Sequence, residues 1–258
     1  MAYTEISGKD NVRIKRIVKL QTSSRFRREE GCFVLEGLRT VEDAFLNGIK
    51  LLEFYFTASA FDKHSSDIEK FAQNAAFVAQ ISDSVSKNIS DTFTPQGIFA
   101  VAGIPERVEE ITEKGKYIAL ENMQDPANLG AVARSAEALG IDGIILSNDC
   151  CDPFSPKSLR ASMGTLLRMP LIFTDDIAQL LKKTTASSYA CVVDSDAEKI
   201  GSLSFNNFSI AVIGNEANGL TEKTKDACDM EVTIPMKGRA ESLNAAAAAS
   251  IVMWEMVK

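Results

Sequence analysis

Short apolar runs alternate with helix-forming segments along the second half of the chain. The expected strands cover residues 117–120, 144–146, 170–173, 189–193, 208–213 and 230–234. The expected helices cover residues 129–139, 155–167, 177–183 and 243–257, with a short helix capped by Thr221 and with Asp175 as the cap of the third. Alternation of this kind predicts an α/β fold built on a parallel sheet that helices cover on both faces.

A weaker alternation of the same type fills the first hundred residues. Strands are expected at 32–35, 51–57, 76–81 and 97–102, and helices at 38–47, 65–74 and 82–89. Pro105 and a charge run without clear periodicity then interrupt the pattern. We therefore expect a small α/β domain at 1–104, a linker at 105–115 and a larger domain at 116–258.

Composition excludes several classes of protein. Of the 258 residues, 45% are hydrophobic and 24% charged, and no apolar run is as long as a membrane-spanning helix requires. The start of the chain does not resemble a secretory signal, and the five cysteines form no CxxC pair. With His64 as the single histidine, no metal site is expected. These features favour a cytoplasmic protein with reduced thiols.

Positive charge is concentrated at the start of the chain. Residues 1–28 carry eight basic and two acidic side chains, a net +6, so a chain of total charge −7 carries −13 elsewhere. Such asymmetry is typical of a segment that binds a polyanion. The expected RNA-binding residues are Arg13, Lys15, Arg16, Arg25, Arg27, Arg28 and, at the next helix start, Arg39. The alternative is a solvated amphipathic helix that buries Ile14 and Ile17.

Three polar loops follow strands of the second domain. The first contains Asn128 and Arg134, the second Gly214 and Glu216, and the third runs from Ile234 to a helix start near Ser242. Ligands of open α/β sheets gather beyond the carboxyl ends of the strands, so we expect these loops to form one site. No Walker A or GxGxxG loop is present, which favours a nucleoside-like ligand held by backbone groups.

The third loop leads into an unusual helix. Ser242 is expected to cap it, and Gly214 and Gly238 are expected to let backbone approach the ligand. The run of alanines at 245–249 gives this helix a face with almost no side-chain depth. It can therefore pack very closely against another segment of backbone.

The three loops in this order resemble a known family. Asn128-x-Gly-x-x-x-Arg134-Ser, Gly214-Asn-Glu216-x-x-Gly-Leu and Ile234-Pro-Met-x-Gly-x-x-x-Ser-Leu-Asn244 are similar to the three motifs of the SpoU (TrmH) branch of the SPOUT methyltransferases. The likeness covers 116–258 and includes Arg160-Ala-Ser-Met-Gly. The first domain resembles, less specifically, the substrate-binding domain of rRNA-directed members, with Phe33-Val-Leu-Glu-Gly as the nearest match.

The resemblance implies a C-terminal domain with a deep trefoil knot that binds S-adenosylmethionine. It also implies a homodimer whose active site includes residues of both subunits, and methyl transfer to a ribose 2′-hydroxyl of structured RNA, most often ribosomal. A tRNA 2′-O-methyltransferase, a base-directed RNA methyltransferase and a catalytically silent RNA-binding protein are the alternatives.

Residue roles follow from the same resemblance. Arg134 would hold a phosphate beside the target ribose and stabilise the developing alkoxide, a role that we favour because a guanidinium keeps its proton at neutral pH. Asn128 and Asn244 would orient the ribose or Arg134, and Glu216 would hold Arg134 or a substrate hydroxyl, unless it is only a carboxylate at a helix N-terminus. The expected cofactor-binding residues are Gly214, Ile234, Met236, Ser242 and Leu243, with Ser242 also donating locally in catalysis.

Overall fold

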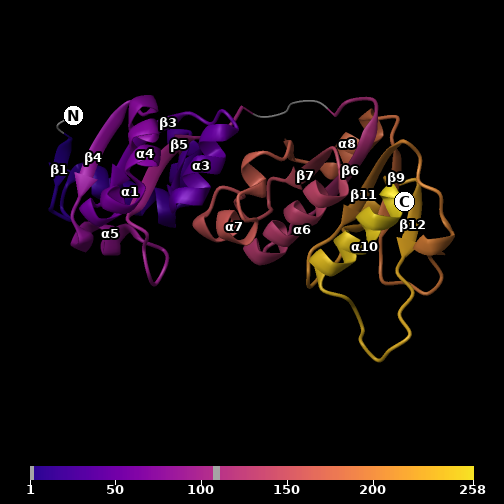
Figure 1. The fold of residues 1–258 in the computed structure, drawn as a ribbon. Coiled ribbons are helices and arrows are strands. Elements are labelled where there is room, and N and C mark those ends of the chain that lie inside the picture. The colour runs from indigo at the N-terminus through magenta and orange to yellow at the C-terminus, as the bar shows by residue number, and fades with distance from the viewer. Residues whose placement is uncertain (1–2, 107–110) are drawn as a thin grey trace. The chain divides into compact units, whose positions relative to one another are not determined.

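The computed structural model describes residues 3–106 and 111–258, so residues 1 and 2 of the basic segment and 107–110 of the expected linker lie outside the described residues. The chain divides into two compact units (Figure 1). One comprises Met1–Pro105 with Phe154–Arg160, and the other Glu106–Pro153 with Ala161–Lys258. The domain bounds expected from the sequence, with domains at 1–104 and 116–258 and a linker at 105–115, remain a proposal.

The first unit is built on a five-stranded sheet of order β1-β4-β3-β5-β2. Its strands are β1 Thr4–Ile6, β2 Cys32–Glu36, β3 Leu51–Phe56, β4 Phe77–Ile81 and β5 Ile98–Gly103. Its helices are α1 Val12–Thr22, α2 Ser24–Glu30, α3 Leu38–Leu46, α4 Ala58–Asn74 and α5 Asp83–Ile89. The sheet is mixed, because β4 runs parallel to β1 and β3 whereas β5 is antiparallel to β2 and β3. Helix α4 begins seven residues before the expected start at residue 65, since Thr57 caps it by accepting from the N–H of Ala60.

Helix α1 explains why apolar residues are spaced as they are in the basic segment. Ile14, Ile17 and Leu20 lie on one face of the helix and are fully buried in the core of the first unit. Asn11 caps the helix, and its side chain accepts from the N–H of Arg13. The amphipathic-helix alternative therefore describes this segment correctly.

The second unit contains a seven-stranded sheet of order β10-β12-β9-β11-β6-β7-β8. The strands are β6 Gly115–Leu120, β7 Gly143–Ser147, β8 Leu171–Thr174, β9 Ser187–Cys191, β10 Glu198–Lys199, β11 Phe208–Ile213 and β12 Met230–Thr233. The helices are α6 Pro126–Leu139, α8 Ile177–Lys183, α9 Glu222–Lys225 and α10 Ala245–Val257, with 3-10 turns at Thr165–Leu167 and Ile200–Ser202. Helix α7 Pro156–Ala161 follows β7 in sequence but belongs, except for its last residue, to the first unit. All pairs of this sheet are parallel, so the predicted α/β class is confirmed.

The alanine-rich helix α10 lies beside α6 (Figure 1), and the hydroxyls of Ser135 and Ser250 are 2.8 Å apart between them. Ala246 and Ala249 are buried, which confirms the close packing expected of the alanine run. The trefoil knot implied by the family resemblance stays a prediction.

Two helix boundaries differ from the expectation for a local physical reason. The helix expected at 155–167 stops at Ala161, because Met163 and Gly164 take left-handed φ angles of 50° and 85°. Asp176, one residue after the expected Asp175, caps α8. No helix among residues 3–106 and 111–258 has the length and apolar character needed to cross a membrane.

Candidate active site

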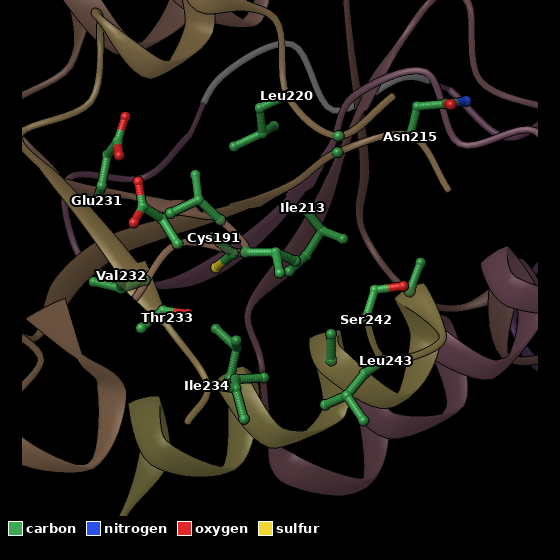
Figure 2. Close-up of a pocket in the computed structure, with 18 of the residues that line it drawn as sticks. Cys191, Ile213, Asn215, Leu220, Glu231, Val232, Thr233, Ile234, Ser242 and Leu243 are labelled. Carbon is green, nitrogen blue, oxygen red and sulfur yellow. The ribbon is translucent and has the colours of Figure 1, made fainter. Parts of the chain in front are cut away.

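A pocket of about 440 Å³ opens beyond the carboxyl ends of β9, β11 and β12. Figure 2 shows Ser242 and Leu243 of the loop before α10 on one side of it and Glu231 of β12 on the other. All five residues expected to bind the cofactor line this pocket, namely Gly214, Ile234, Met236, Ser242 and Leu243. The sequence therefore predicted their proximity, and their role in binding stays a proposal.

The residues that follow β9 form one wall of the pocket, and this wall was not predicted from the sequence. Val192, Val193 and Asp194 line it directly after β9, and Lys225 and Glu231 complete the side toward α9. The rule that ligands gather at the carboxyl ends of strands applies to β9 as much as to β11. Residues 192–194 were not predicted as part of the site because they contain no recognisable motif.

Gly214 is required by the loop itself, and the expectation that its backbone also lies against a ligand stays a prediction. A Cβ at this position would lie 2.2 Å from the carbonyl carbon of Gly219 and 2.4 Å from the nitrogen of Leu220. The loop is closed by paired backbone bonds of 3.0 and 2.9 Å between Asn215 and Gly219. Gly238 has no protein heavy atom within 4 Å of such a Cβ, so the packing of the described residues does not require glycine there, and its expected approach to a ligand stays a prediction.

The pocket offers both apolar side chains and free backbone groups, and an adenosine-containing ligand needs both. Ile213, Val232 and Ile234 supply apolar contact for a flat heterocycle. Within the described part of the chain, no backbone N–H of residues 236–243 donates a hydrogen bond to protein, and Met236, Ser242 and Leu243 of this segment line the pocket. These residues therefore fit S-adenosylmethionine, with free backbone groups for its polar atoms.

Two asparagines expected to face a substrate instead hydrogen-bond each other. Asn244 donates from Nδ2 to Oδ1 of Asn128 at 2.9 Å, and Asn128 donates from Nδ2 to Oε1 of Glu216 at 2.9 Å. Asn128 is 7% exposed. This relay, Asn244–Asn128–Glu216, joins all three loops.

Asn244 also caps helix α10, which corrects the expectation for Ser242. Its Oδ1 accepts from the N–H groups of Ala246 and Ala247 at 3.0 and 3.2 Å. Ser242 remains exposed at the rim of the pocket. Its hydroxyl is thus left for a ligand or substrate rather than for the helix.

Glu216 is held at the N-terminus of α6. Besides the bond from Asn128, its carboxylate accepts from the backbone N–H groups of Gln124 and Asp125, both at 3.2 Å. Burial acts to raise the pKa of Glu216, but the hydrogen bonds from Asn128 and the two N–H groups outweigh it and leave the pKa below its ordinary value. The carboxylate therefore acts on the helix terminus, as the structural alternative stated, and does not contact Arg134.

A second carboxylate, which the sequence did not single out, fixes the other end of the same loop. Glu121 accepts from the N–H and hydroxyl of Thr221 at 2.8 and 2.9 Å, and from the hydroxyl of Thr224. Glu121 and Glu216 thus tie loop 214–220 to the end of β6 and to the start of α6. The loop is positioned before any ligand arrives.

Arg134 stands apart from this network. It is exposed on α6, and no hydrogen bond or ion pair joins its side chain to another residue of 3–106 or 111–258. At 100° per residue, the six positions from Asn128 turn the helix by about 240° and advance it about 9 Å. Within one chain, the guanidinium therefore faces away from the relay and is free to contact another molecule.

The basic segment is largely neutralised by its own unit. Arg13 contacts Glu53 at 2.7 Å, and Arg16 contacts Glu30 and Glu53 at 2.9 and 3.1 Å. Glu53 is 8% exposed, so these two arginines complete a buried charge cluster. Their charge is thus partly compensated within the unit, and their contact with RNA stays a prediction.

The other expected RNA-binding residues divide into three kinds. Lys15 pairs with Asp10 and Arg25 with Glu29 at the surface, where such pairs contribute little. Arg27 is 4% exposed and donates to the carbonyls of Leu20 and Gln21, so it is structural. Arg28 and Arg39 are exposed.

Replacing Arg27 by glutamine is expected to destabilise the first unit by about 1–3 kcal/mol, because buried carbonyls at the end of α1 lose their donor. Arg28→Gln removes the same charge from an exposed position and is the control. Chemical denaturation of both variants checks this. Equal stability of the two would show that Arg27 has no structural role.

The parallel sheet, the pocket at the carboxyl ends of its strands and the relay define an α/β protein whose ligand site is built from loops that follow strands. Residues 115–254, just over half of the chain, match the SpoU rRNA Methylase family. The chain belongs to this family. Residues 11–100 match the MRM3-like substrate binding domain.

Relatives share both parts of the chain. The 23S rRNA (guanosine(2553)-2′-O)-methyltransferase of Bacillus subtilis is 28% identical over 254 residues, 98% of each chain. An uncharacterized tRNA/rRNA methyltransferase of Synechocystis is 28% identical over 97% of this chain and 92% of its own. The AdoMet-bound structure of an rRNA methyltransferase from Sinorhizobium meliloti superposes with a TM-score of 0.87 at 26% identity, covering 98% and 97% of the two chains.

Proposed function

We propose that this protein transfers a methyl group from S-adenosylmethionine to a ribose 2′-hydroxyl of ribosomal RNA. The observation that carries the proposal is the pocket lined by the second and third family motifs, with the relay Asn244–Asn128–Glu216 connecting both to the first motif. The relative from Bacillus subtilis is named for this reaction. A cytoplasmic location agrees with an rRNA substrate and is part of the proposal.

The cofactor supplies an electrophilic methyl group bound to a sulfonium. The chain holds it through the backbone of the loop before α10 and the apolar side chains of Ile213, Val232 and Ile234. Glu121 and Glu216 keep loop 214–220 in place on the other side. Because Glu121 and Glu216 fix loop 214–220 in advance, little ordering of that loop is needed when the ligand binds.

Arg134 is assigned to the RNA. A substrate hydroxyl that attacks the methyl group loses its proton, and negative charge builds on its oxygen in the transition state. A guanidinium keeps its own proton at neutral pH, so Arg134 would stabilise that oxygen and the adjacent phosphate by charge-assisted hydrogen bonds. Ser242 would donate a further hydrogen bond from the pocket rim.

We further propose a homodimer in which Arg134 of one subunit completes the site of the other. Support comes from the orientation of Arg134 away from its own relay and from the apolar surface of α10, where Ile251 and Trp254 are 38% and 58% exposed. Tryptophan at an exposed helix position is typical of an interface.

Mixing two inactive variants tests the shared site. Arg134→Ala and Asn244→Ala chains are each expected to be inactive, whereas hetero-dimers contain one site with both residues intact. Co-refolding the two should restore up to about a quarter of wild-type activity, since half of the dimers are mixed and each has one competent site. Failure of complementation, or a monomer in sedimentation at micromolar concentration, would contradict the arrangement.

The reaction itself is tested with methyl-labelled cofactor and rRNA from cells that lack the gene. Label is expected in a 2′-O-methylated nucleoside after digestion of the RNA. Label on a base would indicate a base-directed enzyme, and label in tRNA alone would indicate the other substrate. Binding of RNA without transfer would indicate a catalytically silent protein.

A further inference from the structure

An aromatic ring in the first unit is fully exposed among the described residues. Phe93, in the loop between α5 and β5, is 105% exposed, more than any other large hydrophobic side chain of the described residues. Single exposed apolar residues are common and need no explanation by themselves. Phe93 is unusual because the residues on both sides of it, Thr92 and Thr94, line a pocket of about 190 Å³.

The loop that carries Phe93 is tied to strand β2 at one end and to the start of helix α3 at the other. The carboxylate of Glu36 accepts from the hydroxyls of Ser90 and Thr92 at 2.6 and 2.7 Å, and from the N–H of Asp91 at 2.9 Å. On the far side, Oε1 of Gln96 accepts from the N–H of Leu38 at 2.9 Å. The ring is therefore presented by a built loop.

The pocket offers mainly hydrogen-bond donors. Arg39 is exposed and forms no ion pair with residues 3–106 or 111–258. Gln96 has committed its carbonyl oxygen to Leu38, which leaves its amide N–H groups available. Thr40 and Thr94 add hydroxyls, and the one carboxylate among the lining residues, Glu36, already accepts three hydrogen bonds from the loop.

We propose that this pocket and Phe93 form a subsite for an unpaired nucleotide of the RNA substrate. The base stacks on the ring of Phe93, and the phosphate lies against the guanidinium of Arg39. This inference rests on the proposed function in that RNA is the substrate. It places recognition in the loop 92–96 and the start of α3 rather than in α1, whose arginines are largely paired.

The chemistry of the surface favours a nucleic acid over a protein. RNA-binding proteins read unpaired bases by stacking them on aromatic rings and by hydrogen bonds to their edges, with cations on the backbone. A protein partner would be expected to bury a wider apolar patch than one ring among threonines. Every base has a face that can stack, so the subsite tolerates different sequences.

Affinity for deproteinised rRNA from cells lacking the gene tests the subsite in the full-length protein. Phe93→Ala is expected to weaken binding by about 5- to 100-fold, the range of one lost stacking contact, whereas Phe93→Tyr keeps the ring and stays within about 3-fold of wild type. Leu46→Ala, at another exposed apolar position of the unit, is the matched control and should bind as wild type.

Arg39→Gln tests the phosphate contact. It is expected to lower the slope of log affinity against log salt by about 0.7, the value for one contact to a single strand. Arg28→Gln removes the same charge from an exposed position on α2 and should change the slope by less. If both substitutions lowered the slope equally, Arg39 would contribute only non-specific electrostatic attraction, and its assignment to the phosphate would be overturned.

Fluorescence provides a direct readout of stacking. The chain has one tryptophan, Trp254, so Phe93→Trp in a Trp254→Phe background places the single indole on the loop. RNA is expected to quench it. An unquenched indole at saturating RNA would overturn the stacking contact.

Failure of the subsite is distinguishable from failure of the proposed function. Wild-type methyl transfer to rRNA with equal RNA affinity for wild type and Phe93→Ala overturns the subsite alone. Absent transfer to any rRNA contradicts the proposed function, while the binding measurements still decide the subsite. A change in sedimentation mass on Phe93→Ala would assign the ring to a protein contact and overturn the proposal.

Discussion

Arg134→Lys is expected to lower turnover by about 100-fold or more while the affinity for S-adenosylmethionine stays unchanged. Lysine keeps the positive charge but loses the planar fork that can bond an alkoxide and a phosphate together. Arg134 is exposed on α6 and does not line the cofactor pocket, so the loss should be confined to the chemical step. Single-turnover kinetics and calorimetry measure the two quantities separately.

A matched substitution controls for the charge and the helix. Lys157→Arg, on α7, exchanges the same two side chains in the opposite sense at an exposed position and should leave turnover unchanged. Wild-type turnover of Arg134→Lys would refute any special role for the guanidinium. Reduced cofactor affinity would instead place Arg134 in the pocket.

Gly214→Ala is expected to weaken cofactor binding by more than about 100-fold and to cost about 1–3 kcal/mol of stability, as overpacking does. The added methyl group would lie 2.2 Å from the carbonyl carbon of Gly219, so backbone must move. That movement would open the loop that both Glu121 and Glu216 hold in place.

Gly238→Ala is the matched control, because its Cβ would meet nothing within 4 Å. It should bind the cofactor and unfold nearly as the wild type does. If Gly214→Ala bound with wild-type affinity in calorimetry, loop 214–220 would not be a rigid wall of the site. If Gly238→Ala abolished binding, the ligand itself would approach that backbone.

Much of the fold could be predicted from the sequence. Strands such as Phe208–Ile213 read as short apolar runs because parallel strands are buried on both faces. The loops that begin at Gly214 and Ile234 were predicted to lie together because each follows a strand whose carboxyl end reaches the same edge, whereas the choice of cofactor-binding residues within them came from the family resemblance. These features depend on local pattern and on a general rule of sheet topology.

Side-chain partners could not be predicted in the same way. Asn128, Glu216 and Asn244 are far apart in sequence, and each could have faced a ligand as well as another protein group. Glu53 lies 40 residues from Arg13, so nothing local showed that the charge of α1 is neutralised in the folded unit. The net charge of residues 1–28 therefore overestimated the unpaired positive charge that the folded unit presents.

Maps of rRNA 2′-O-methylation from cells with and without the gene test the central claim most directly. One methylated ribose is expected to be lost on deletion, to return with the wild-type gene, and to stay absent with Arg134→Ala. Identical maps from both strains, or a lost methyl group that resides on a base, would contradict the proposed reaction.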